Sequence, residues 1–213
     1  MPTPATHWDH VYATKDPTQV SWYQPVPETS LRLIRTHGHP KGAVIDIGAG
    51  ASFLVENLLH IGHTDITLLD VSAVALKLTL DRLGPRAPLV HTVAADVASW
   101  SPTRKWDIWH DRAVFHFLTE TSAIAHYRDI LADSLPPGGI AVVAAFHLTG
   151  PDRCSNLPTA RYDATTLHRA LGGPGTFELL EAFVEQHPHP RGHTQAFQVV
   201  ALRKRSLSCA SCP

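Results

Sequence analysis

Two glycines have the spacing of a tight turn beside a ligand. Gly48 and Gly50 lie in the segment VIDIGAGAS, residues 44–52, between an apolar run typical of a strand and a stretch typical of a helix. Glycine lets the backbone turn sharply and approach a ligand, because no Cβ intrudes. The following helix would point free N–H groups at the same place, which favours a carboxylate or phosphate. Alone, the pair also fits an ordinary turn.

Two acids follow the next two predicted strands. Asp70 ends the run DITLLD, twenty positions after Gly50, where a carboxylate can accept hydrogen bonds from both hydroxyls of a ribose. Asp96 follows the third strand in AADVASW, where it can accept from an exocyclic adenine amine while Val97 packs on the ring. Each acid alone also fits a helix cap or a solvated turn. Because all three features stand at the carboxyl ends of strands, they predict one binding crevice.

The elements that must position these residues alternate between strand and helix. We expect strands at 43–47, 65–70, 88–93, 106–110 and 140–146. We expect helices at 28–38, at 51–60, from an N-cap at Ser72 to Leu83, and at 121–135. This alternation predicts a parallel sheet with right-handed crossovers. Asp163 is expected to cap a helix to residue 171, and strands at 177–185 and 195–202 are expected to pair antiparallel at one edge.

These motifs resemble those of the class I S-adenosylmethionine-dependent methyltransferases. Asp46–Gly50 (DIGAG) is similar to their first motif, Asp70 to their ribose acid and Ala95–Val97 to their adenine motif. Leu135–Gly139 (LPPGG) is similar to the turn before their fifth strand, so the likeness runs from Val44 to Phe146. Among short bacterial members, the chain resembles thiol methyltransferases and protein-lysine methyltransferases.

The resemblance implies an α/β fold: a single Rossmann-like domain whose seven-stranded sheet is mostly parallel, with an antiparallel C-terminal strand. It implies S-adenosyl-L-methionine as the cofactor and in-line methyl transfer, for which no nucleophilic residue is obligatory. Ser52 departs from the pattern, since many members have a third glycine there, and this leaves the loop shape open. The implied cofactor-binding residues are Trp22, Tyr23, Asp46, Gly48, Ala49, Gly50, Ser52, Asp70, Val71, Asp96, Val97 and Asp111.

The acceptor is expected near the segment WDIWHDRAVFHFLT, residues 106–119. Asp111 and Arg112 resemble the Asp-Arg pair of some small-thiol methyltransferases, and His110 and His116 are candidate bases because a neutral imidazole is poised near working pH. We take Asp111, Arg112 and His116 as the candidate catalytic residues. The alternatives are a structural ion pair between Asp111 and Arg112, and a packed core histidine at position 116.

Aromatic residues are frequent before the first strand. Trp8, Tyr12, Trp22 and Tyr23 are candidates for a lid, because aromatic faces attract a cationic sulfonium and exclude water. Ordinary hydrophobic anchoring is the alternative. We expect a lid or helical segment over residues 1–40, the methyltransferase domain over 41–205 and a disordered tail over 206–213.

Composition bounds the function. The 213 residues carry a formal net charge of −1 and are 44% hydrophobic. The chain therefore has no overall positive charge that would indicate nucleic acid or a membrane surface as its partner. The absence of a Walker-type GK[ST] after the glycines excludes nucleotide triphosphate hydrolysis, and the spacing differs from GxGxxG of dinucleotide dehydrogenases. Without a signal peptide or a long apolar run, the expected location is the cytoplasm.

Cysteine and histidine clusters invite a metal interpretation that we do not adopt. Cys154, Cys209 and Cys212 are too few and odd for a disulfide framework, and CxxC in the tail supplies only two ligands. The histidines of HPHPRGH, residues 187–193, are separated by prolines and fit a surface loop. We therefore expect no metal.

The favoured function is methyl transfer to a small nucleophile, a thiol or related chalcogen compound. One rival is methylation of a protein lysine, since short methyltransferases with a similar WDHVY-type N-terminus do this. Another is a non-catalytic protein that binds S-adenosylmethionine.

Overall fold

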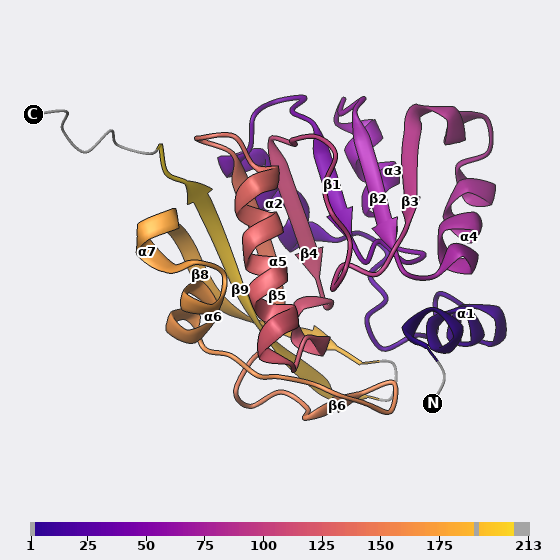
Figure 1. The fold of residues 1–213 in the computed structure, drawn as a ribbon. Helices are drawn as coiled ribbons and strands as arrows, with labels where there is room; N and C mark the ends of the chain where they lie inside the picture. Colours follow the sequence, from indigo (N-terminus) through magenta and orange to yellow (C-terminus); the bar gives the residue numbers. More distant parts are fainter. Residues whose placement is uncertain (1–2, 190–191, 207–213) are drawn as a thin grey trace, which may run out of the picture.

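One twisted sheet organises the chain. The computed structural model describes residues 3–189 and 192–206. The strand order of the main sheet is β3-β2-β1-β4-β5-β9-β8 (Figure 1). Its strands are β1 (Val44–Ile47), β2 (Ile66–Asp70), β3 (Val90–Ala94), β4 (Ile108–Arg112), β5 (Ile140–Phe146), β8 (Phe177–Pro188) and β9 (Thr194–Lys204). The first five strands pair in parallel, and β9 runs antiparallel to both β5 and β8. The predicted fold class is confirmed.

Helices cover both faces of the sheet. The longer helices are α1 (Pro4–Thr14), α2 (Glu28–His37), α3 (Leu54–His60), α4 (Ala73–Leu83), α5 (Thr121–Ser134) and α6 (Ala164–Ala170). Shorter elements are the helix α7 (Gly173–Thr176), the 3-10 turns η1 (Gly84–Leu89) and η2 (Phe115–Phe117), and the hairpin strands β6 (Arg153–Cys154) and β7 (Leu157–Pro158). Ser72 caps α4 and Asp163 caps α6, as predicted, and Asp163 forms a capping box with Thr166.

Strand alternation divides the core in two. Because successive side chains of a strand point to opposite faces, neighbouring apolar residues enter different clusters. Val44 and Ile140 pack with leucines of α2 and α3 on one face. Ile45 and Ala141 pack with Trp109 and the apolar side of α5 on the other. The strands read as continuous apolar runs because both faces are buried.

Several strand boundaries differ from prediction, among them the start of β3 and the end of β4. β3 starts at Val90 because Pro85 and Pro88 hold residues 84–89 in a 3-10 turn. β4 runs to Arg112, since Asp111 and Arg112 continue its pairing with β5 opposite Val143 and Ala144. These two residues therefore belong to the strand itself and point to opposite faces of the sheet.

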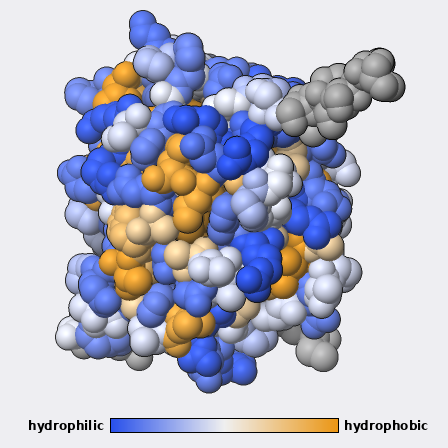
Figure 2. Space-filling model, turned by 90° about the vertical axis from the view of Figure 1, so that its left-hand side faces the viewer, coloured by the Kyte–Doolittle hydropathy of each residue, from blue (hydrophilic) through white to orange (hydrophobic). Residues whose placement is uncertain are grey.

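The carboxyl ends of the parallel strands lie at the covered end of the molecule. Helix α1 and the β6–β7 hairpin both lie at this end (Figure 1). Figure 2 views the side that β8 closes, where apolar patches alternate with hydrophilic side chains; Leu179 and Val184 of β8 are partly exposed. Across the described residues, every helix is too short or too polar to traverse a bilayer.

Candidate functional site

The turn after β1 is built on two glycines with left-handed backbone. The φ angle is +61° at Gly48 and +54° at Gly50. A Cβ on Gly48 would stand 1.9 Å from Val114 Cγ2, and a Cβ on Gly50 would stand 2.3 Å from the Tyr12 hydroxyl oxygen. Backbone conformation and space therefore both exclude larger residues here.

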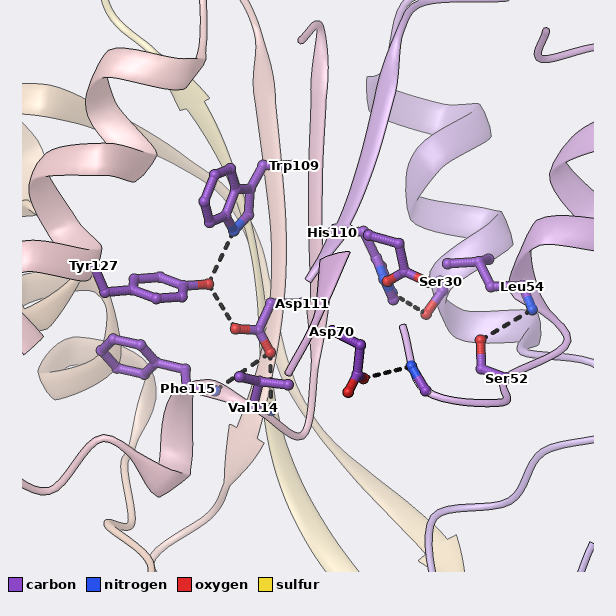
Figure 3. A network of polar contacts seen from close by, with 12 residues as sticks. Ser30, Ser52, Leu54, Asp70, Trp109, His110, Asp111, Val114, Phe115 and Tyr127 are labelled. Carbon is purple, nitrogen blue, oxygen red and sulfur yellow. Dashed lines mark hydrogen bonds and ion pairs between the residues drawn. The ribbon is translucent and has the colours of Figure 1, made fainter. Parts of the chain in front are cut away.

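The rest of this turn is tied to its neighbours. The amide of Ala49 donates to the carbonyl of Leu69 on β2 at 3.0 Å. Ser52 Oγ accepts from the amide of Leu54 at 3.3 Å (Figure 3), so α3 begins at Leu54, three residues later than predicted. Ser52 thus serves the start of the helix where the family pattern has glycine.

Asp70 joins the glycine turn to the end of β2. Its Oδ2 accepts from the amide of Gly50 at 2.7 Å (Figure 3), and its Oδ1 accepts from the amide of Ser72 at 2.7 Å. Burial raises the pKa of this carboxyl to about 6, although the two amides act in the opposite direction. A carboxylate has about four lone-pair sites, so two stay free for a ligand.

Asp96 and its neighbours follow β3. Asp96 Oδ1 accepts from the amide of Ala98 at 2.9 Å, which shapes the loop. Val97 is buried, and Val71 follows Asp70 on the neighbouring strand. All of these residues line the same cavity.

Two cavities open at this end of the sheet. The larger, of about 360 Å³, is bounded by aromatic residues of the N-terminal segment, by the ends of β2 and β3, and by β4, η2 and β5. The smaller, of about 60 Å³, shares Tyr12, Trp22, Gly48 and Arg112 with it. Predicted residues of the larger cavity are Trp22, Gly48, Asp70, Val71, Asp96, Val97, Arg112 and His116. Those of the smaller are Trp22, Tyr23, Asp46, Gly48, Ala49, Ser52 and Arg112.

A buried relay of three polar residues borders the smaller cavity. Asp46 Oδ1 lies 2.6 Å from His110 Nδ1, and His110 Nε2 lies 2.8 Å from Ser30 Oγ on α2. Figure 3 shows His110 and Ser30 between β4 and α2. Both nitrogens of His110, a candidate base, are therefore engaged within the protein.

Asp111 is enclosed by other partners. Tyr127 donates its hydroxyl proton to Oδ2 at 2.6 Å, and the amides of Val114 and Phe115 donate to Oδ1 at 3.0 and 3.4 Å (Figure 3). Burial raises the pKa of Asp111 to about 6. Asp111 is fully buried and lines neither cavity, so its carboxylate holds the turn that begins at residue 113.

Arg112 points to the opposite face and lies between the two cavities. Its Nη1 donates to the carbonyl of Trp22 at 3.2 Å, and its Nη2 lies 3.7 Å from Glu185 Oε2 on β8. Its Cζ lies 4.8 Å from the centroid of the Phe197 ring. The charge partner of Arg112 is thus Glu185, and the alternative of an Asp111–Arg112 ion pair does not describe this geometry.

His116 is fully buried in η2 and lines the large cavity. Its ring stacks on Phe146 at 4.1 Å with an interplanar angle of 4°. Burial, and after it the charge of Arg112, lowers the pKa of His116 to about 3. The imidazole is therefore neutral at physiological pH.

Aromatic rings of the N-terminal segment cover the site. The ring of Trp22 lies 5.7 Å from that of Trp8 and 6.3 Å from that of Tyr12. Tyr23 packs edge-on to Phe53 at 5.9 Å, beside the smaller cavity. Burial raises the pKa of the Tyr12 hydroxyl, which stays protonated.

The sequence did not identify several residues of this end of the sheet. Glu185, Gln195 and Phe197 arrive from β8 and β9, whose antiparallel return brings them beside β5. Cys154, left without a role, lines the large cavity and is partly buried. Cys209 and Cys212 lie outside the described residues. Within residues 3–189 and 192–206, no cluster of three or more acidic, histidine or cysteine residues could hold a metal.

Comparisons with known proteins agree on the fold. No family model matches this chain. An S-adenosylmethionine-dependent methyltransferase from Anabaena variabilis superposes with a TM-score of 0.75 at 14% identity, covering 94% of this chain and 93% of that one. The N-methyltransferase NodS from Bradyrhizobium japonicum, solved with S-adenosyl-L-homocysteine, gives 0.71 at 18% identity over 95% and 98%. A structure described for the conversion of a disulfide bond into a thioacetal group during echinomycin biosynthesis gives 0.74 at 18% over 96% and 94%.

One relative is similar in sequence. The eEF1A lysine and N-terminal methyltransferase of Mus musculus is 30% identical over 93 residues, which are 44% of this chain. The matched part covers 13% of that protein. From the sheet order, the reversed β9 and these superpositions, the chain has the fold of the class I S-adenosylmethionine-dependent methyltransferases.

Proposed function

We propose that this chain is an enzyme that transfers a methyl group from S-adenosyl-L-methionine to a small-molecule nucleophile, with a thiol or related chalcogen compound favoured. One observation carries the proposal: the glycine turn and the carboxylates of Asp70 and Asp96 border a single cavity at the carboxyl ends of β1, β2 and β3. This is where doubly wound sheets bind their ligands.

The shape of the site fits the cofactor. Glycine at positions 48 and 50 lets the turn pack closely against Val114 and Tyr12, because a Cβ at either position would clash with these side chains. Asp70, with two free lone-pair sites, would hold the ribose hydroxyls beside Val71. Asp96 would accept from the adenine amine, with Val97 against the ring. The methionine part would reach the smaller cavity, bordered by Asp46, Gly48, Ala49 and Ser52, with Gly50 in the same turn.

The N-terminal segment would act as the cover. Trp22 and Tyr23 border the smaller cavity, and the backbone of Trp22 is bonded to Arg112 inside the site. We propose residues 1–40 as this cover and residues 41–205 as the methyltransferase domain. The proposed location is the cytoplasm, because sparse cysteines fit a reducing compartment.

The cofactor would supply a methyl group on a sulfonium, which is already a good leaving group. What falls to the chain is alignment of the acceptor and exclusion of water. Asp111 would contribute as a positioning residue, because its hydrogen bonds to two amides fix the turn that carries His116.

The largely apolar lining of the large cavity supports a small acceptor. The description of the echinomycin-related neighbour, which concerns sulfur chemistry, also favours a thiol. The mouse relative, which is named a lysine and N-terminal methyltransferase, favours a protein amine as the second candidate.

Methyl-labelled S-adenosylmethionine tests these alternatives. We expect label in a volatile or small thioether when the protein is incubated with a panel of thiols, and S-adenosylhomocysteine in equal amount. Label found only on proteins of a cell lysate would overturn the small-acceptor assignment. Calorimetric binding without any S-adenosylhomocysteine formed would instead support a non-catalytic binding protein.

A further inference from the structure

Two cavity-lining side chains have buried polar atoms without a hydrogen-bond partner among the described residues. They are both ring nitrogens of His116 and the Nε and Nη2 atoms of Arg112. Leaving such buried groups unpaired is costly, because they lose their hydrogen bonds to water without gaining others. Because both side chains line the large cavity, a bound molecule is the partner that this geometry lacks.

Arg112 is a cation held away from water. Its side chain is only 10% exposed, and one face of the guanidinium lies against Phe197. The charged and titratable groups around it are Glu185 and His187 of β8 and His116 of η2. Glu185 Oε2 lies 3.7 Å away, and its Oε1 accepts from Thr29 at 2.6 Å. The guanidinium therefore keeps unfilled N–H groups beside the cavity.

His116 is not equipped to accept a proton from the acceptor. Its neutral ring offers one N–H donor and one acceptor nitrogen, and its pKa is held at about 3 by burial and by Arg112. A thiol, with an ordinary pKa of about 8.5, would not transfer its proton to so weak a base. A thiol acceptor at this place would therefore lose its proton to solvent rather than to His116.

Resting on the proposed function, we propose that Arg112 and His116 form the acceptor subsite and that the acceptor binds there as a thiolate, stabilised by the Arg112 guanidinium and oriented by a hydrogen bond to neutral His116. The same cation opposes the binding of an ammonium group, so an acceptor that arrives as a protonated lysine fits this place less well than a thiolate. This selects between the two candidate acceptor classes.

The reaction balances without a protein base. The thiol proton passes to bulk water when the acceptor binds. A sulfur lone pair then forms the new bond to the methyl carbon, while the bond from that carbon to the sulfonium breaks and its electron pair stays on the cofactor sulfur. The products are a neutral methyl thioether and S-adenosylhomocysteine.

Benzenethiol is a suitable probe of the subsite, because its thiolate and thiol differ in ultraviolet absorbance. No turnover occurs when the demethylated product replaces the methyl donor. The thiol is titrated in the presence of the protein saturated with S-adenosylhomocysteine. We expect the bound thiol to ionise at a lower pH than the free thiol, as a neighbouring cation favours the thiolate.

Three variants separate the roles. Arg112→Gln should raise the pKa of bound benzenethiol to that of the free thiol. At a pH below both values, the ionised fraction of the bound thiol should then fall about tenfold for each pH unit by which its pKa rises. Arg112→Lys should keep most of the effect, and Glu185→Gln should lower the pH of ionisation further by removing the counter-charge. Arg128→Gln, a charge loss on the surface of α5, is the matched control.

The catalytic pH profile gives the second readout. The pH midpoint of the acid limb of kcat/KM for thiols should shift in these variants in the same order as the ionisation of bound benzenethiol. His116→Gln should lower kcat/KM but leave this midpoint at its wild-type pH. A limb that disappears in His116→Gln and is unmoved in Arg112→Gln would make His116 the base and overturn the inference. Methylation of amines in preference to thiols would also overturn it, whereas failure to bind S-adenosylhomocysteine would count against the proposed function itself.

Discussion

At the scale of single residues, Asp70 serves the fold and the cavity at once. Its two oxygens hold the amides of Gly50 and Ser72 at 2.7 Å each, and the same carboxylate faces the large cavity. Substitution of Asp70 should therefore change both the affinity for the cofactor and the pH dependence of that affinity.

Asp70→Ala should weaken the binding of S-adenosylhomocysteine by more than about 1 kcal/mol, because a charged hydrogen-bonding partner is lost. Isothermal calorimetry on the purified chain measures this. The control is Asp81→Ala, which removes an exposed acid of α4 that is paired with Lys77. Equal affinity in the Asp70 variant and the wild type would contradict the assigned ribose contact.

The pH dependence of the same binding follows from the raised pKa of Asp70, about 6. As pH falls through that value the carboxylate gains a proton and loses accepting capacity, so affinity should drop from about pH 7 to about pH 5. In Asp70→Asn the loss of affinity between these pH values should be smaller. If the variant and the wild type lose affinity equally, another group is responsible for the pH dependence.

Gly50→Ala should reduce stability and cofactor affinity more than Gly84→Ala. Both glycines have φ near +54°, but only at Gly50 would the new Cβ meet the Tyr12 hydroxyl oxygen, at 2.3 Å. At Gly84, with φ +53° and ψ −122°, nothing lies within 4 Å, so that variant carries only a backbone cost of about 1–3 kcal/mol. Thermal unfolding with and without S-adenosylhomocysteine measures both; equal losses would mean that Tyr12 does not restrict the turn.

Sequence reasoning at this scale reached the residues fixed by local backbone and missed those fixed by packing. Gly48, Gly50 and Asp70 could be predicted because strand ends and turn chemistry are local. The pairing of Arg112 with Glu185 could not be predicted. The two residues are 73 positions apart in the sequence, and they meet only because β8 lies at the edge of the sheet beside β9.

At the scale of elements, α1 is fastened to the start of α4. Asp9 Oδ1 accepts from Ser72 Oγ at 2.6 Å and from the amide of Val74 at 3.3 Å. Ser72 is also the N-cap of α4, so one small cluster begins α4 and holds the helix that carries Trp8 and Tyr12 to the cavity.

Asp9→Ala should loosen α1 while leaving the sheet intact. Loss of a partly buried charged hydrogen bond is expected to cost about 1–2 kcal/mol locally. Hydrogen exchange should therefore accelerate in residues 4–14 and not in β1 or β4. Asp16→Ala is the matched control, because Asp16 bonds only within its own turn, to Thr18. Exchange that rises equally in both variants would show that Asp9 has no fastening role.

Element identity was largely legible in the sequence, whereas element ends were not. The predicted bounds of β5 match the observed ones because its apolar run begins directly after Gly139. The ends of β3 and β4 depend on a proline-rich 3-10 turn and on pairing with a neighbouring strand, which local patterns do not specify. Helix α1 was not delimited because its few apolar residues form a face only against α4.

At the scale of the whole molecule, buried titratable groups make stability depend on pH in opposing ways. Asp70 and Asp111 have pKa values raised to about 6, so the stability they contribute is full below about pH 4 and is lost as pH rises through 6. His116, with a pKa lowered to about 3, contributes stability above about pH 6.5 that is lost as pH falls toward 3.

A His116→Gln variant isolates the histidine contribution. Between about pH 6.5 and about pH 4.5 the wild type should lose on the order of 2 kcal/mol more unfolding free energy than the variant, since only the wild type gains a proton at this position on unfolding. Denaturant unfolding at the two pH values measures the difference. His91→Gln, at an exposed position of β3, controls for histidine loss in general, and parallel curves for wild type and His116→Gln would refute the assignment.

The indole rings of Trp8 and Trp22 stand in the wall of the large cavity, whereas those of Trp106 and Trp109 are buried in the core. The molecule thus contains its own optical reporter: occupancy by an adenosyl compound should quench emission from the two wall tryptophans while the core pair stays constant. Stopped-flow fluorescence can therefore follow ligand entry and departure in the unmodified chain, with no attached dye.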